Sequence, residues 1–159
     1  MTTQTVITVD AMTIVAATYV VEMTGNKAIY ITHSQGGSVG WETPVENVSA
    51  IIAIEPGAAP EIGGEQYKKL LEANIPIVFY YGDYIDNGPE DIQSTEFWKG
   101  ARDGAHAFAE AYNADGGDCT VYYLPDEGIT GNSHFMFQEM NNKEIADHIE
   151  KWLGERGLN

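Results

Sequence analysis

The sequence predicts an α/β protein whose mostly parallel sheet, of about four to five strands, is flanked by helices. Three apolar runs carry this prediction, at residues 48–54, 75–81 and 120–124. The first run is apolar almost throughout, which is typical of a parallel strand buried on both faces. Helical segments separate the three runs, and strands that alternate with helices favour a parallel sheet.

The segment before these runs begins with residues 6–9, a short strand or an extended lead-in. Asp10 is a suitable N-cap for a helix over residues 11–23, because its side chain can accept a hydrogen bond from the first helical turn. We expect residues 27–32 to form a further strand, followed directly by a short helix over residues 35–41.

Later elements alternate in the same way. Residues 56–64 form a loop rich in glycine and proline, and Pro76 stands near the start of its strand, where proline is tolerated. The closing helix is amphipathic, with Ile145 and Trp152 on its apolar side. The remaining helices are predicted over residues 66–73, 95–112 and 142–155. We expect one domain over residues 1–159.

Composition excludes several classes of protein. The chain is 43% hydrophobic and 20% charged, which disfavours a disordered protein. Eight basic against 24 acidic residues give a net charge of −16, which repels phosphate backbones and anionic lipid. Neither nucleic acid nor a membrane is therefore predicted as a partner. Cys119 is the only cysteine, so neither an intrachain disulfide nor a cysteine-based metal cluster can form.

The cellular location is predicted as cytoplasmic. No apolar run is long enough to cross a bilayer. The first residues lack the basic region and the apolar core of a signal peptide. A leader that had already been removed would leave the same sequence.

Residues 29–37 read Ile-Tyr-Ile-Thr-His-Ser-Gln-Gly-Gly and carry the most specific signal. Ser34 follows an apolar run and has small residues, Thr32 and Gly36, two positions away on each side. This is the pattern of a nucleophile elbow, with threonine in place of the first glycine. The tight turn strains the backbone, exposes the serine hydroxyl and presents the N–H of Gln35 as an oxyanion donor.

From this elbow to near its end, the chain resembles the carboxyl-terminal half of an α/β-hydrolase. Residues 124–125, 128–134 and 141–147 are similar to a bacterial and fungal esterase branch of that superfamily. The resemblance implies a truncated α/β-hydrolase fold without its amino-terminal half. It also implies a carboxylic-ester hydrolase that forms an acyl-enzyme on Ser34 and needs no metal and no organic cofactor.

A serine, an acid and a histidine follow one another in the order that this superfamily uses. His134 stands between the last strand and the final helix, which is where these enzymes carry the base. Glu55 is the acid that the esterase branch implies, and a carboxylate that ends a doubly buried strand is costly unless it is paired. Asp83 is the alternative acid, with Asp86 behind it, because most α/β-hydrolases place the acid there.

Other side chains receive lesser roles. His33 is expected to point into the structure around the elbow, while His106 and His148 lie in helices and have packing or solvent roles. Trp41, Phe135 and Phe137 are candidate pocket residues for a small ester substrate. A dehalogenase or an epoxide hydrolase is disfavoured, because those enzymes carry a carboxylate where this chain has serine.

The edge strand and the oxyanion hole leave alternatives open. Without earlier strands, residues 27–32 form an exposed apolar edge, which a second copy, a separate chain or residues 6–9 could cover. We expect a homodimer or a higher oligomer. Residues 1–25 contain no Gly-rich run for a second oxyanion donor. The alternatives to an active esterase are a catalytically silent assembly module and one half of a split hydrolase.

Overall fold

The computed structural model describes Tyr19, residues 22–23, residues 27–88 and residues 95–158. The predictions for residues 6–9 and for Asp10 lie outside the described residues, as does most of the helix predicted over residues 11–23.

The described residues form one sheet of parallel strands, which confirms the predicted fold class. The strand order is β1-β2-β3-β4, so strands that follow one another in sequence are neighbours in space. The strands are β1 (Ala28–His33), β2 (Val48–Ile54), β3 (Ile77–Tyr81) and β4 (Cys119–Tyr123). The prediction for β2 is correct at both ends, and the other three strands deviate by two residues at most.

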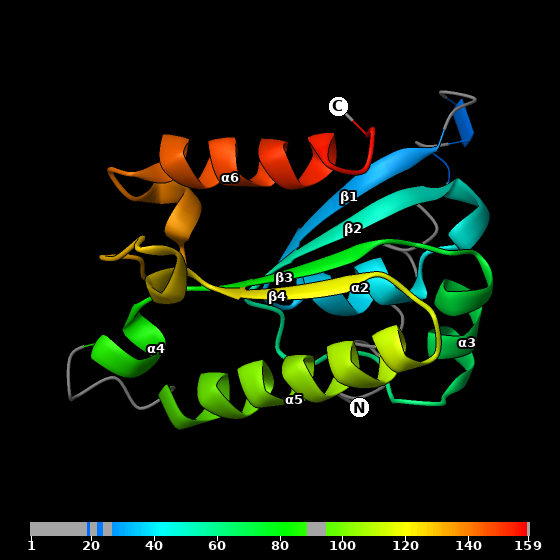
Figure 1. Cartoon of the computed structure of the whole chain (residues 1–159), viewed down its shortest axis with the longest axis horizontal. Coiled ribbons are helices and arrows are strands. Elements are labelled where there is room, and N and C mark those ends of the chain that lie inside the picture. The colour runs from blue at the N-terminus through cyan, green and yellow to red at the C-terminus, as the bar shows by residue number, and fades with distance from the viewer. Residues whose placement is uncertain (1–18, 20–21, 24–26, 89–94, 159) are drawn as a thin grey trace, which may run out of the picture.

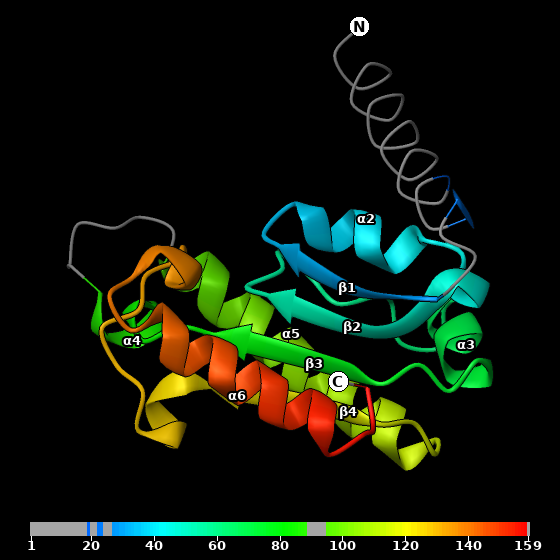
Figure 2. The same ribbon diagram turned by 90° about the horizontal axis from the view of Figure 1, so that it is seen from above.

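Helices cover both faces of this sheet (Figure 1). They are α2 (Gly36–Glu42), α3 (Glu65–Glu72), α4 (Tyr84–Asn87), α5 (Thr95–Ala114) and α6 (Asn142–Gly154). Short 3-10 turns stand at Val45–Asn47, Leu124–Glu127 and Met136–Gln138. Helix α6 lies on one face, while α2, α3 and α5 lie on the other (Figures 1 and 2). The short helix α4 was not predicted, because four residues are too few to show a helical period.

The hydrophobic core consists of two clusters, one on each face of the sheet. Ile51 packs with the side chains of α2, α3 and α5, whereas its neighbour Ile52 packs with Trp152 of α6. Both isoleucines are completely buried. Successive strand residues point to opposite faces, so a strand with helices on both sides needs apolar residues at every position. This explains why the run at β2 shows no alternation.

Helix α2 packs very closely against β1 and against the segment that follows β2. A Cβ atom on Gly40 would lie 2.7 Å from Cγ2 of Thr32, and one on Gly37 would lie 2.7 Å from Cβ of Pro56. A Cβ atom on Gly36 would meet nothing within 4 Å. The steric requirement expected at Gly36 therefore falls on the two later glycines, because their side of α2 faces the sheet.

We predict that Gly40→Ala lowers the free energy of unfolding by about 1–2 kcal/mol, because overpacking outweighs the better helix propensity of alanine. Gly104→Ala in α5 is the matched control. Its Cβ atom would meet nothing within 4 Å, so we expect a gain of up to about 1 kcal/mol. Urea unfolding followed by circular dichroism measures both. Equal effects of the two substitutions would contradict the packing argument.

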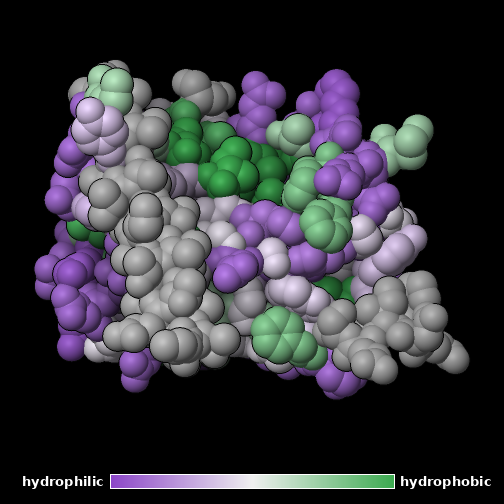
Figure 3. Space-filling view, turned by 180° about the vertical axis from the view of Figure 1, so that it is seen from behind, coloured by the Kyte–Doolittle hydropathy of each residue, from purple (hydrophilic) through white to green (hydrophobic). Residues whose placement is uncertain are grey.

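Strand β1 is an edge of the described sheet, because β2 is the one strand it pairs with there. Ile29 packs on the α6 side of the sheet, and Ile31, which points the same way, is 62% exposed. Figure 3 shows hydrophobic side chains gathered along the upper part of this side of the molecule. An apolar parallel strand with one free edge is a suitable surface for pairing with another strand.

We predict that a second copy of the chain covers this edge. The strand carries no acidic or basic side chain other than His33, so two copies can pair there without placing like charges opposite each other. Light scattering at micromolar concentration should give a dimer or a higher oligomer. Ile31→Lys should shift it to monomer, whereas Ile62→Lys, at an exposed loop position, should not. A wild-type monomer would refute the prediction.

Candidate active site

Ser34 directly follows β1 and Glu55 directly follows β2. Because these adjacent strands are parallel, both residues lie at the carboxyl-terminal end of the sheet. Both residues have a left-handed backbone, with φ of 55° at Ser34 and 39° at Glu55. Their N–H groups continue the sheet ladder, donating to the carbonyls of Ile54 (3.0 Å) and Tyr80 (2.9 Å). Non-glycine residues rarely adopt this conformation, and such strain concentrates at functional sites.

Glu55 is 2% exposed, and both of its carboxylate oxygens have a partner. Oε2 accepts a hydrogen bond of 2.6 Å from Nδ1 of His134, and Oε1 accepts one of 2.7 Å from the N–H of Gly82. A Cβ atom at Gly82 would lie 2.9 Å from Oε1, so the close approach of this N–H requires glycine. With Nδ1 donating to Glu55, Nε2 of His134 is left as the proton acceptor.

Asp83, the alternative acid, holds the loop that carries His134. Its Oδ2 accepts a hydrogen bond of 2.8 Å from the N–H of Gly131, and its Oδ1 accepts one of 2.6 Å from the Asn87 amide. The side chain is 7% exposed and bonds to no histidine in the described structure. Asp86 pairs instead with Arg102 at 2.6 Å, which lowers the pKa of Asp86.

Two rings enclose the imidazole of His134. Trp98 of α5 lies 4.2 Å away between ring centroids, tilted by 33°, and His33 lies at 4.4 Å. Nε2 of His33 donates a hydrogen bond of 2.8 Å to the carbonyl of His134. Burial lowers the pKa of His33, so its ring is neutral at neutral pH. No local pattern in the sequence indicates a role for Trp98, whose contact with His134 spans 36 positions.

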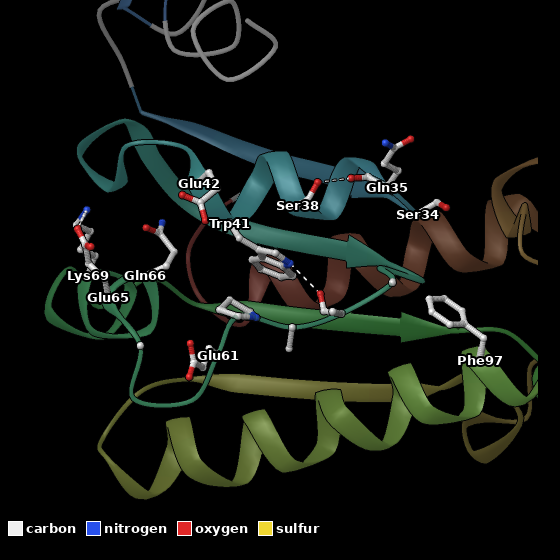
Figure 4. A pocket seen from close by; sticks show the side chains of 15 residues that line it. Ser34, Gln35, Ser38, Trp41, Glu42, Glu61, Glu65, Gln66, Lys69 and Phe97 are labelled. Atoms are coloured by element: carbon white, nitrogen blue, oxygen red, sulfur yellow. Dashed lines mark hydrogen bonds and ion pairs between the residues drawn. The ribbon is translucent and has the colours of Figure 1, made fainter. Parts of the chain in front are cut away.

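Ser34 lines a cavity of about 650 Å³ (Figure 4). In the described structure, His134 bonds to Glu55 and His33 and makes no hydrogen bond to the Ser34 hydroxyl. Gln35 lies beside Ser34 at the start of α2, where backbone N–H groups have no partner within the helix. Trp41 lines the same cavity, and its Nε1 donates to the carbonyl of Ala58 at 2.9 Å.

The other two candidate pocket residues lie elsewhere. Phe135 and Phe137 pack against His33, with ring centroids at 5.1 and 4.9 Å, and neither lines this cavity. Both rings are almost half exposed, so they form part of the surface beside β1. The two remaining histidines lie on helices, and His148 shares a hydrogen bond of 3.0 Å with the hydroxyl of Tyr80.

Other kinds of site find no support in the described part of the chain. No group of histidine, cysteine, aspartate and glutamate side chains there could hold a metal ion. Within the same residues, no helix has the length and apolarity needed to cross a membrane. Cys119 is buried in β4, and burial raises its pKa, so the thiol is unreactive at neutral pH.

Comparison with known proteins gives two informative matches, although no family description matches the chain. The chain is 28% identical to a protein of Fungal sp. named "Probable secreted lipase phiG", in an alignment of 165 residues that covers 79% of the chain. It also matches the solved structure of a novel bacterial esterase, with 31% identity and a TM-score of 0.77 over 92% of the chain. It spans 45% of the length of the lipase and 43% of that of the esterase.

These similarities agree with the parallel sheet and its layers of helices. The chain therefore has a fold of the α/β-hydrolase type. Because it spans less than half of either relative, their activities come to this protein as proposals.

We predict that Asp83→Ala loosens the loop that carries His134. The substitution leaves the N–H of Gly131 without its acceptor, which should cost about 1–3 kcal/mol in the free energy of unfolding. Asp86→Ala, which breaks a partly exposed ion pair, should cost at most about 1 kcal/mol. Chemical denaturation measures both, and hydrogen exchange should show faster exchange around Gly131 in the first variant alone. Equal protection of this loop in the two variants would contradict the anchoring role.

Proposed function

We propose that the protein is a serine hydrolase that acts on carboxylic esters through Ser34, His134 and Glu55. The observation that supports this most strongly is the buried pair of Glu55 and His134 at the strand ends where Ser34 occupies a strained turn. Such a pair orients an imidazole and supports its protonation beside a nucleophile. The names of the two relatives, a lipase and an esterase, point to the same class of substrate.

In the proposed reaction, Oγ of Ser34 attacks the carbonyl carbon of the ester, and Nε2 of His134 takes the hydroxyl proton. Glu55 stabilises the imidazolium through Nδ1–H, while the N–H of Gln35 donates to the oxyanion. Collapse of the tetrahedral intermediate breaks the ester bond, and the departing alcohol takes the proton from His134. A water then attacks the acyl-enzyme with the same base and releases the acid and free Ser34.

In the described structure Ser34 and His134 share no hydrogen bond, and this is compatible with the proposed reaction. Hydrogen bonds of catalytic groups are often long in unliganded sites and tighten when substrate binds. The same observation, together with the single oxyanion donor that we assign among the described residues, favours the second candidate, a catalytically silent protein that keeps the elbow and the acid–histidine pair. The two candidates differ in whether Ser34 is activated, which a covalent probe measures directly.

A fluorophosphonate probe, read by intact mass, tests this proposal. We expect one adduct on the wild type and none on Ser34→Ala. Ser49→Ala, at the opposite end of β2 from the site, should still be labelled. His134→Gln and Glu55→Gln should lower kcat for 4-nitrophenyl butyrate by about a thousandfold or more.

A folded wild-type protein that takes no adduct and releases no 4-nitrophenol would refute the esterase proposal. That result would place the catalytically silent candidate first. Activity that appears only after a second polypeptide is added would instead indicate one half of a split hydrolase.

A further inference from the structure

The cavity beside Ser34 differs in character between its two ends. Figure 4 shows Ser34 and Phe97 at one end, and Glu65 and Lys69 of α3 at the other, with Trp41 between them. A ligand whose carbonyl reaches Ser34 would therefore extend along Trp41 toward charged side chains. The two ends of the cavity would therefore contact chemically different parts of a substrate.

The middle of the cavity is apolar and rigid. Trp41 is 5% exposed, lies 5.5 Å from the ring of Phe79 and is fixed by its hydrogen bond to Ala58. Ala59 and Pro60 also line the cavity. A preformed apolar wall of this kind suits a hydrocarbon chain, because binding removes apolar surface from water without ordering the protein.

The far end carries an excess of negative charge. Lys69 forms an ion pair of 2.7 Å with Glu65, so these two charges cancel. Glu42 and Glu61 also line the cavity, and in the described structure neither forms an ion pair. Glu65, Glu42 and the nearby Glu46 raise the pKa of Lys69, which places all three carboxylates within electrostatic range of this end. Of the three carboxylates that line the cavity, Glu42 and Glu61 thus have no ion-pair partner among the described residues.

The geometry of α2 sets the distance between the reacting carbonyl and this charge. Gln35, Ser38 and Glu42 line the cavity and are spaced by three and four residues, so they share one face of the helix. Seven residues of α-helix rise by about 10 Å from Gln35 to Glu42. A chain of about six carbons would cover most of this distance.

Resting on the proposed function, we propose that the cavity holds the acyl chain of the substrate and selects esters whose acyl chain ends in a positive charge. The acyl group stays on Ser34 through both steps of the reaction, so the cavity that begins at Ser34 and Gln35 binds it throughout. Glu42 and Glu61 attract a cation at the far end and repel an anion. The net charge of −16 acts in the same direction over longer distances.

Three 4-nitrophenyl esters test the proposal: the 6-(trimethylammonio)hexanoate, its neutral isostere 7,7-dimethyloctanoate, and the monoester of adipic acid. At low salt we expect kcat/KM to fall in this order, with about tenfold or more between the cation and the anion. High salt should reduce that ratio, because the charges at the far end are exposed to solvent.

Variants assign the preference to the proposed residues. Glu42→Gln combined with Glu61→Gln should lower the ratio of kcat/KM between the cationic ester and its isostere several-fold. Glu72→Gln, at the end of α3 and away from the cavity lining, is the matched control and should change neither value. Equal effects of the control and the double variant would overturn the assignment.

Different results would overturn the charge preference and the proposed esterase function. Equal kcat/KM for the cationic ester and its isostere would overturn the inference and leave an esterase. Should no ester be hydrolysed, the proposed function fails, and calorimetric titration of Ser34→Ala with the same esters then decides. Tighter binding of the cationic ester would support the charge preference of the cavity, and equal binding would overturn it.

Discussion

The buried carboxylate of Glu55 is the constraint on which the candidate site depends. An ionised carboxylate that is almost fully removed from water is stable only when its oxygens are well paired. Here Gly82 at the end of β3 supplies one partner and His134 supplies the other. The loop that carries His134 must therefore approach the strand ends closely, and glycine at position 82 leaves room for this approach. Removing either partner would leave a buried carboxylate oxygen without its hydrogen-bond donor, which is costly.

The parallel sheet makes this arrangement possible. The carboxyl ends of parallel strands lie at the same end of the sheet. The residues that follow β1, β2 and β3 are therefore neighbours in space, although each lies 20 to 30 positions from the next in the sequence. Asp83 follows Gly82 in the chain and accepts a hydrogen bond from the backbone of the loop that carries His134. It therefore holds a second point of that loop at the same end of the sheet. The strand ends thus carry Ser34, Glu55 and the residues that support the His134 loop, while the long loop between β4 and α6 carries His134 itself.

The same helix serves the reacting centre and the cavity. Helix α2 begins beside Ser34 and presents the N–H of Gln35, and its far end carries Trp41 and Glu42. Its position is fixed by glycines that allow contact with β1 and with Pro56. A change that moves α2 would therefore alter the proposed oxyanion donor and the cavity wall together. The proposed charge preference is thus linked geometrically to the proposed chemistry.

The sequence by itself determined the parallel α/β sheet, because a buried strand and an amphipathic helix each have a local periodicity that survives without tertiary context. The turn at Ser34 was also readable, since small residues within a few positions define it. For Glu55, the sequence showed a carboxylate at the end of a buried strand, and the choice over Asp83 depended on resemblance.

Only the tertiary structure decided which distant groups meet. It paired Glu55 with His134 across 79 positions and placed Trp98 against the imidazole. It also showed that Phe135 does not line the cavity to which Trp41 contributes. The physical reason is that such contacts arise from the packing of whole elements, and an aromatic residue gives no local sign of whether it will face a core, a cavity or solvent.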